Sequence, residues 1–368
     1  MNASLNKKLG TVKWGEFKYK EVFNRIEQGR RLKKDDQIDG TIPFVMSGTT
    51  NAGVVNYISN PVASFPKNAI TIDIFGNTFY RNYAFGAGDD TGVYWNDATA
   101  YSSNAMLFFA VAMQKSMMGR FSYGKKLRSS QSEDFTMHLP VTDDGTIDFD
   151  FMESFIAELE AERVAELSAY LTVSGLDNYE LSNNEMAIIE RYKKHQIPFS
   201  EFEFIKIFNN IKQGRRLKKD DQLPGDIPFV MSGTTNTGVI GYISNPVARF
   251  PKNSITIDIF GNSFYRNYDF GAGDDTGVYW NTEKEYSRTC MLFFAAAMGR
   301  ALRGKYSYGK KLRSSQSIHF KMQLPTKDGK PDYDAMAALI SAVQKLVIKD
   351  VVLYADRKIE KTKDVTKR

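Results

Sequence analysis

The stretch Gln28-Gly29-Arg30-Arg31-Leu32-Lys33-Lys34-Asp35-Asp36-Gln37 decides how this chain is organised, because it occurs again as residues 213–222. The repeat continues without a gap: residues 28–132, the first copy, align with residues 213–317, the second copy, and 80 of the 105 aligned positions are identical. A unit of this length is a whole domain, since solenoid repeats span only about 20–50 residues. We therefore expect two like domains in one polypeptide, which suits a target with two similar halves; DNA is the commonest such target.

The composition is that of an ordinary globular protein with an excess of positive charge. Of the 368 residues, 42% are hydrophobic and 25% are charged, the net charge is +6 and the isoelectric point is about 9.0. This charge permits a polyanionic partner without demanding one. The single cysteine, Cys290, allows no internal disulfide and fits a reducing cytoplasm. No apolar run reaches the roughly 20 residues that span a bilayer, and the amino terminus lacks a signal-peptide core, so we expect a cytoplasmic protein.

The order of patterns predicts two β-rich α+β domains, each followed by a long helix. Strand-like segments fall at residues 42–46, 53–58, 69–75 and 78–81, with helices at residues 19–29 and 106–118. A third helix is expected at residues 183–195, where Ser182 and Glu185 form a capping box. The expected divisions are a first domain (1–147), a helix (148–174), a link with the short helix (175–198), a second domain (199–331), and a helix with a basic tail (332–368).

The two long helices carry apolar stripes at three- and four-residue spacing and opposite charge. Met152, Phe155 and Leu159 mark the first stripe, whereas Met336 and Leu339 begin the second. The first helix is rich in glutamate and the second in lysine and arginine. We expect them to pair as an antiparallel coiled coil; the alternative is that each stripe packs on its own domain.

The residues that could perform catalysis form no recognisable active site. Asp73, Asp89 and Asp90 recur in the second copy, but no pair of acids is followed by the Glu-x-Lys pattern that restriction-type nucleases use to hold metal ions. The glycine-rich residues 86–92 lack the Gly-Lys-Ser/Thr ending of a phosphate-binding loop, the three histidines are scattered, and no methyltransferase motif is present. The chain alone is therefore predicted not to be an enzyme.

Two groups of polar and basic residues, present in both copies, favour DNA binding. Arg30, Arg31, Lys33 and Lys34 are expected to hold phosphates, while residues 123–132 mix an aromatic ring, three cations and small polar donors suited to groove contacts. The loop at residues 47–51 and the turn at Asn77 offer further donors. The candidate DNA-binding residues of the first copy are Arg30, Arg31, Lys33, Lys34, Thr49, Asn51, Asn77, Arg81, Tyr123, Lys125, Lys126, Arg128, Ser129 and Gln131. Those of the second copy are Arg215, Arg216, Lys218, Lys219, Thr234, Asn236, Asn262, Arg266, Tyr308, Lys310, Lys311, Arg313, Ser314 and Gln316.

This order of domains and helices, with several sequence marks, resembles the specificity subunits of Type I restriction-modification systems and the similar subunits of Type IIB systems. The marks are residues 29–37 followed by Gly40-Thr41-Ile42-Pro43-Phe44-Val45, the domain-closing His138-Leu139-Pro140, their second copies, and the link at residues 175–181. The resemblance covers nearly the whole chain.

The resemblance implies two target recognition domains that read the halves of a bipartite site in double-stranded DNA, held apart by a helical spacer. Such subunits do no chemistry. Methyltransferase subunits and a restriction subunit, or a fused methyltransferase-nuclease, dock on them, and S-adenosylmethionine, Mg and ATP are expected on those partners and not on this chain.

The near-identity of the two copies departs from the family pattern, in which the two recognition domains usually differ strongly. If the domains are related by an approximate two-fold axis, they should prefer an interrupted, nearly palindromic site. Differences at residues 97–100, 103–105 and 114–118 are expected off the base-reading surface, whereas those at Ala52, Val55 and Asn56 are expected closer to DNA. Two other classes stay open: a DNA-modifying or DNA-cleaving enzyme with duplicated lobes, and a protein scaffold that binds no DNA.

Overall fold

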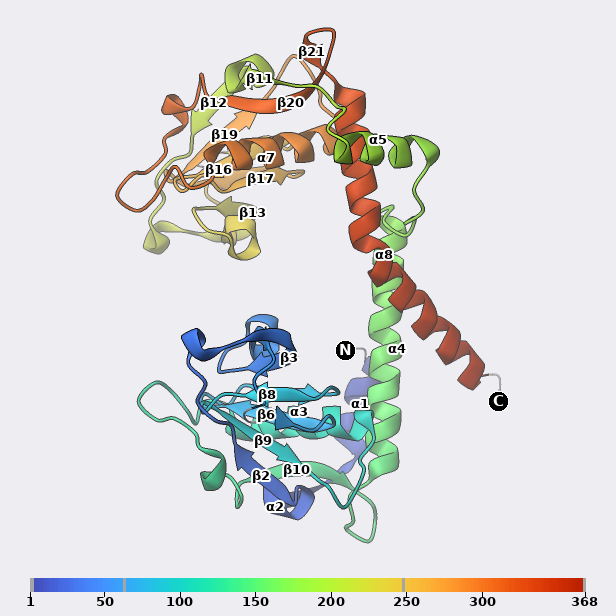
Figure 1. Ribbon diagram of the computed structural model, residues 1–368. Helices are drawn as coiled ribbons and strands as arrows, with labels where there is room; N and C mark the ends of the chain where they lie inside the picture. Colours follow the sequence, from blue (N-terminus) through green and yellow to red (C-terminus); the bar gives the residue numbers. More distant parts are fainter. Residues whose placement is uncertain (1–2, 62–63, 247–248, 367–368) are drawn as a thin grey trace. The chain divides into compact units, whose positions relative to one another are not determined.

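A computed structural model describes residues 3–61, 64–246 and 249–366, with side chains described as far as residue 360 (Figure 1). The end of the predicted basic tail therefore lies outside the described side chains. The chain divides into two compact units: residues 1–167 with 357–368, and residues 168–356. None of the described helices is long and apolar enough to cross a lipid bilayer.

The first unit holds two four-stranded sheets and a strand pair. Strand order is β2-β9-β6-β7 in one sheet and β4-β3-β8-β5 in the other, and β1 pairs with β10. All neighbours are antiparallel except β3 and β8. The strands are β1 (Lys13–Lys18), β2 (Arg25–Gln28), β3 (Asp39–Val45), β4 (Val54–Ile58), β5 (Ser64–Phe65), β6 (Ala69–Asp73), β7 (Thr78–Arg81), β8 (Phe85–Ala87), β9 (Thr91–Trp95) and β10 (Thr136–Val141). The helices are α1 (Ala3–Thr11), α2 (Tyr19–Val22), α3 (Ser103–Met117) and α4 (Phe149–Val173).

The second unit repeats this arrangement. Its sheets run β12-β19-β16-β17, β14-β13-β18-β15 and β11-β20-β21. The strands are β11 (Phe199–Glu203), β12 (Asn210–Gln213), β13 (Pro224–Val230), β14 (Val239–Ile243), β15 (Arg249–Phe250), β16 (Ser254–Asp258), β17 (Ser263–Arg266), β18 (Phe270–Ala272), β19 (Thr276–Trp280), β20 (Lys321–Lys327) and β21 (Lys330–Pro331). The helices are α5 (Asn183–Lys193), α6 (Phe204–Ile207), α7 (Arg288–Leu302) and α8 (Tyr333–Thr366). The two long helices cross the division: α4 belongs to the second unit from Ser168 on, and α8 belongs to the first unit from Arg357 on. The predicted α+β class is confirmed.

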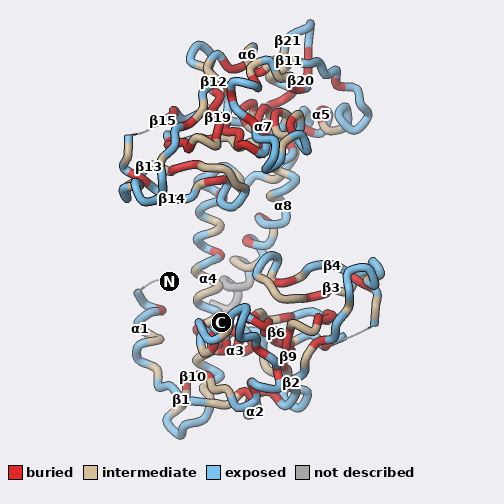
Figure 2. Tube along the Cα trace, turned by 90° about the vertical axis from the view of Figure 1, so that its left-hand side faces the viewer, coloured by how far each residue is buried: buried red, intermediate tan, exposed pale blue. Residues whose placement is uncertain are grey.

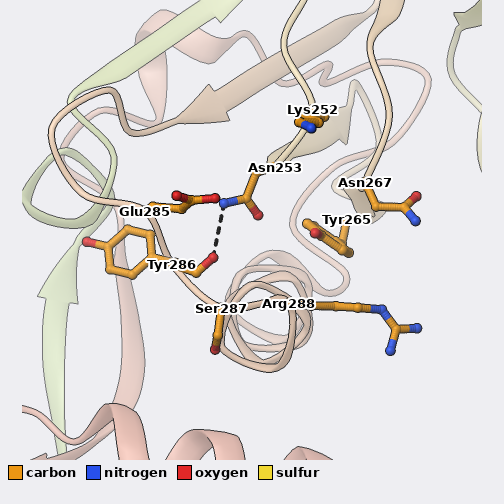
Figure 3. A pocket seen from close by; sticks show the side chains of 8 residues that line it. All are labelled: Lys252, Asn253, Tyr265, Asn267, Glu285, Tyr286, Ser287 and Arg288. Carbon is orange, nitrogen blue, oxygen red and sulfur yellow. Dashed lines mark hydrogen bonds between the residues drawn. The ribbon is translucent and has the colours of Figure 1, made fainter. Parts of the chain in front are cut away.

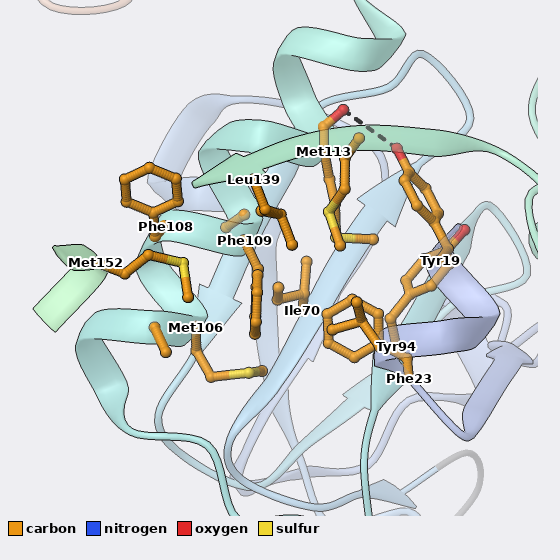
Figure 4. Packing of buried hydrophobic residues seen from close by; sticks show 14 of the residues in the cluster. Tyr19, Phe23, Ile70, Tyr94, Met106, Phe108, Phe109, Met113, Leu139 and Met152 are labelled. Atoms are coloured by element: carbon orange, nitrogen blue, oxygen red, sulfur yellow. Dashed lines mark hydrogen bonds between the residues drawn. The ribbon is translucent and has the colours of Figure 1, made fainter. Parts of the chain in front are cut away.

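The main core of each unit lies between one four-stranded sheet and the helix that follows its last strand. These are the sheet β2-β9-β6-β7 with α3 in the first unit and the sheet β12-β19-β16-β17 with α7 in the second. In the first unit Phe23, Ile70, Tyr94 and Phe109 are fully buried and pack together under α3 (Figure 4). Burial is complete along β6 and nearly so along β9, as the red segments of Figure 2 show. Strands buried on both faces are continuous runs of apolar and β-branched residues, and this pattern predicted the strand over residues 69–75 that contains β6, whereas β9 was not predicted.

The helix predicted over residues 19–29 is wrong. It stops after one turn, at α2, and residues 25–28 form strand β2 against β9, with Arg25 opposite Trp95 and Gln28 opposite Gly92. Side chains alternate outward and inward along β2. Pairing with β9 decided the conformation, because strand formation depends on the neighbouring strand more than on local propensity.

The predicted short helix of the link is confirmed as α5, and its capping box is present, with the side chains and backbone N–H groups of Ser182 and Glu185 bonded reciprocally. Glu185 also joins α5 to α8. Its carboxylate accepts hydrogen bonds from Ser341 Oγ at 2.5 Å and Lys345 Nζ at 2.9 Å, while Ile188 packs against Leu339. The link is thus attached to the first half of α8.

Stability of the second unit is expected to fall in acid through Glu185. Burial alone would raise the pKa of this carboxyl, but hydrogen bonds from Ser341, Ser182 and Lys345 lower it to about 2. A lowered folded-state pKa contributes stability above the unfolded value near 4.5, and this contribution is lost as the pH falls toward 2. It amounts to about 3 kcal/mol, since each pKa unit corresponds to about 1.4 kcal/mol. The unfolding temperature of Glu185→Gln should lie below that of the wild type near neutral pH, and the gap should close between about pH 4.5 and pH 2. A gap that stays constant over this range would contradict the assignment.

Candidate nucleic-acid interface

The first basic segment (residues 30–34) leaves strand β2 through a glycine that no other residue could replace. A Cβ on Gly29 would lie 2.2 Å from the Gly88 carbonyl oxygen, because the chain passes directly over the glycine-rich turn at residues 86–92. Two backbone bonds fix this crossing, from Gly29 N to Thr91 O and from Arg30 N to Ala87 O, both 2.9 Å. Beyond the crossing the four predicted phosphate-binding cations of each copy are exposed: Arg30, Arg31, Lys33, Lys34, Arg215, Arg216, Lys218 and Lys219.

The second polar segment (residues 122–132) begins with a tight turn closed by two backbone bonds between Ser122 and Lys125. At its tip the Tyr123 side chain is 84% exposed, and Lys126 Nζ lies 4.9 Å from its ring centroid. The second copy repeats this with Tyr308, 82% exposed, and Lys311 at 4.6 Å. A tyrosine this exposed contributes little to packing, so it is available to a ligand. The neighbouring cations Lys125, Lys126, Lys310 and Lys311 are also exposed.

Gln28 joins the two segments, a role that the sequence patterns did not predict. Its Nε2 donates to the Asp89 carbonyl at 3.0 Å, and its Oε1 accepts from Ser129 N at 2.8 Å. The Arg128 guanidinium donates to the same Asp89 carbonyl. Gln213 makes the equivalent bonds in the second copy. Both predicted groups are therefore attached to one glycine-rich turn. The available signal was the position of Gln28, two residues before the first basic segment, which is repeated by Gln213 in the second copy.

Two predicted groove contacts turn away from solvent in this arrangement. Ser129 and Ser314, which were predicted to contact DNA, are each only 5% exposed in this structure. Ser129 instead closes the turn, as its carbonyl accepts from Ser132 Oγ at 2.6 Å. Gln131 and Gln316 are exposed, but their Oε1 atoms accept the backbone N–H of Arg128 and Arg313, which leaves their Nε2 atoms facing outward.

The loop at residues 47–53 is anchored on a buried aspartate. Asp73, 3% exposed, accepts bonds from Ser47 Oγ at 3.2 Å and Gly48 N at 3.0 Å. It also accepts from the backbone of Phe75 and from both nitrogens of Asn77. The Asn77 amide is thus turned inward, as is that of Asn262 toward Asp258. The predicted donors at the loop tip, Thr49, Asn51, Thr234 and Asn236, are exposed.

Arg81 and Arg266 were predicted to bind DNA, but both are buried in this structure, with exposed fractions of 2% and 1%. Arg81 donates to Thr71 Oγ1 at 3.1 Å, Tyr83 Oη at 3.1 Å and the Ala52 carbonyl at 2.6 Å. Burial lowers the pKa of this guanidinium, which its hydrogen bond to Tyr83 partly offsets. Ala52 has a positive φ of 50°, which is unfavourable for a residue with a Cβ. The arginine therefore holds the loop at residues 47–53 from inside the domain.

Two of the acids shared by both copies hold the loop at residues 47–53. Asp90 accepts from Ser47 N at 3.0 Å and from Thr91 Oγ1, so Asp73 and Asp90 hold one loop between them. Across the described residues, no group of three or more His, Cys, Asp or Glu side chains could hold a metal ion.

A hollow of about 500 Å³ lies in the second unit near the start of α7. Figure 3 shows the side chains that line it. Asn253 Nδ2 donates to the Tyr286 carbonyl at 3.0 Å across it. Glu285 and Arg288 stand where the first copy has Ala100 and Ser103, so the hollow is lined partly by residues that distinguish the copies. No predicted DNA-binding residue lines it; the lining residues are Lys252, Asn253, Tyr265, Asn267, Glu285, Tyr286, Ser287 and Arg288.

Comparison with known proteins assigns both units to one family. The Type I restriction modification DNA specificity domain matches residues 11–169 and again residues 200–351. This chain belongs to that family. The two matches coincide with the two units that repeat Gln28, the glycine-rich turn and the basic segments, so the predicted internal repeat is a repeat of the specificity domain.

Two relatives extend the comparison. The specificity subunit S.BcgI of a Type II restriction enzyme from Heyndrickxia coagulans is 29% identical over 155 residues, which are 41% of this chain and 45% of that subunit. The match thus spans less than half the length of that curated relative. The Type I restriction-modification S subunit from M. genitalium shares the fold, with a TM-score of 0.54 and 15% identity over 96% of this chain and 94% of its own.

Proposed function

We infer that this chain is a DNA-specificity subunit whose two domains each read one half of a bipartite site. The observation that carries the proposal is the presence of two specificity domains in one chain that share the same exposed cations and the same internal contacts. Domains with near-identical surfaces recognise near-identical sequences. The site should therefore be interrupted and nearly palindromic, provided that the domains read opposite strands.

The chain is proposed to work with partners that perform the chemistry. Methyltransferase subunits and a restriction subunit, or a fusion of the two, would supply the catalytic residues and bind S-adenosylmethionine, Mg and ATP. The helices α4 and α8 are the proposed spacer, as an antiparallel coiled coil. Within the first unit, the ion pair of Lys358 and Glu160 at 2.5 Å supports contact between these helices. Exposed apolar residues on α8, Val343, Leu346 and Val347, supply a surface that a protein partner could cover.

Selection from a randomised duplex pool tests the proposal. The chain, purified alone and with the proteins encoded beside it, should enrich two nearly matching half-sites in inverted orientation with a fixed gap, since each domain offers the same readers. Enrichment of two unrelated half-sites would overturn the near-palindromic site. Absence of salt-dependent DNA binding in both preparations would overturn DNA recognition itself and favour the scaffold.

A further inference from the structure

The copies differ next to the first basic segment, where β3 meets β4. Asn56 on strand β4 of the first copy corresponds to Gly241 on strand β14 of the second. Across from it, the short 3₁₀ helix at Lys34–Asp36 ends at Gln37, and the corresponding helix at Lys219–Asp221 ends at Gln222. The glutamine is common to both copies, whereas its neighbour on the next strand is not.

In the first copy the glutamine is held. Gln37 Oε1 accepts a hydrogen bond from Asn56 Nδ2 at 3.0 Å, in a half-buried position. This bond uses one of the two lone pairs of Oε1 and fixes the orientation of the carboxamide against β4. A base edge would have to meet the carboxamide in that fixed orientation.

In the second copy the same glutamine is released. Gly241 carries no side chain, and a Cβ built there would meet nothing within 4 Å, so open space lies beside the strand. Among the described residues the Gln222 carboxamide makes no hydrogen bond, and its oxygen and nitrogen are both available.

The backbone around the glutamine is the same in both copies, so the difference lies in the side chain. In the first copy, Asn60 holds the backbone on both sides of Gln37: its Oδ1 accepts from Ile38 N at 2.8 Å, and its Nδ2 donates to Asp36 O at 3.1 Å. Asn245 makes the same bonds to Leu223 N and Asp221 O at the same distances. The substitution of Asn56 by glycine thus changes the availability of one carboxamide on a fixed support.

A free glutamine carboxamide carries the donor and acceptor that match N7 and N6 of adenine in the major groove. The exposed cations Lys218 and Lys219 lie four and three residues before Gln222, with the exposed Asp220 and Asp221 between them, and would bring the DNA backbone close on the lysine side of this turn. We propose that Gln222 reads an adenine in its half-site and that Asn56 withholds Gln37 from the same reading, so that the half-sites differ at this position. The proposal rests on the DNA recognition inferred above.

Reciprocal substitutions test it in the full chain with its partner subunits. Asn56→Gly should free Gln37 and create a preference for adenine of about tenfold or more at one position of the first half-site. Gly241→Asn should remove the same preference from the second half-site. Binding would be measured by competition between duplexes that differ only at that base pair, at one salt concentration. The unfolding temperature of each variant would be compared with the wild type, because Gly and Asn differ in strand propensity.

Two alanine variants complete the design. Gln222→Ala should remove the adenine preference of the second half-site, and Gln37→Ala should leave the first half-site as it is in the wild type. Unchanged preferences in both Asn56→Gly and Gly241→Asn, or equal losses from Gln37→Ala and Gln222→Ala, would overturn the assignment. If the wild type selects its site while the variants shift nothing, only this assignment fails; if the wild type selects no DNA, the proposed function fails with it.

Discussion

Asp73→Asn is expected to destabilise the first domain by about 2–4 kcal/mol and to release the loop at residues 47–53. The Asp73 carboxylate is buried, and both of its oxygens accept hydrogen bonds; the donors belong to Ser47, Gly48, Phe75 and Asn77. An amide nitrogen in its place would face those donors and leave buried groups unpaired, which costs about 1–3 kcal/mol for each lost bond of this kind. Hydrogen exchange should show the loop opening.

The second copy supplies an internal reference for this measurement. Peptides that include Ala52 differ in mass from those that include Thr237, so the two loops can be followed separately in one sample. The matched control is Asp89→Asn, which removes the same charge from a carboxylate with no hydrogen-bond partner among the described residues. Faster exchange in both loops, or an equal effect of Asp89→Asn, would show that Asp73 is not the anchor.

Replacing Arg30, Arg31, Lys33 and Lys34 together by alanine is expected to weaken binding to every DNA sequence alike, by roughly hundredfold or more at moderate salt. Each phosphate contact releases counter-ions, so the slope of log affinity against log salt concentration should become shallower by about 3–4 units. These four side chains are exposed and lie beyond the core, and the domain should therefore keep its unfolding temperature.

A control variant that loses four cations at another place distinguishes the loss of phosphate contacts from the loss of net charge. A variant with Lys7, Lys13, Lys18 and Lys20 changed to alanine loses the same charge outside the repeat and should keep most of the salt slope. If both quadruple variants lose affinity equally, the first basic segment does not hold the phosphates. If the first variant loses affinity for its matched site only, the segment reads bases and not the backbone.

Much of the fold could be predicted because its signals are local. The helix at α5 begins with Ser182 and Glu185 three residues apart, and the buried strand β6 is an unbroken run of β-forming residues. The failure at β2 shows the limit of local signals. One turn of helix and four alternating residues carry too little information until β9 is known to lie beside them.

The types of residue in the candidate site could be predicted from the sequence, but not the direction in which each side chain points. The exposed cations of the two segments could be named because Lys and Arg rarely lie inside a domain without partners. Arg81 is the exception, since Thr71, Tyr83 and Ala52 together satisfy its guanidinium. Those partners lie up to 29 residues away along the chain, so no spacing rule could find them.

By itself, the sequence determined that this protein has two like β-rich domains with matching basic segments, because a repeat, a charge and a hydrophobic period are properties of the chain. The tertiary structure alone decided how those segments are joined, which polar residues point inward, and which copy has a free glutamine. Gln28 meets Ser129 across 101 residues and Gln37 meets Asn56 across 19. Hydrogen bonds of this kind depend on distances of about 3 Å between atoms, and only folding brings such distant residues that close.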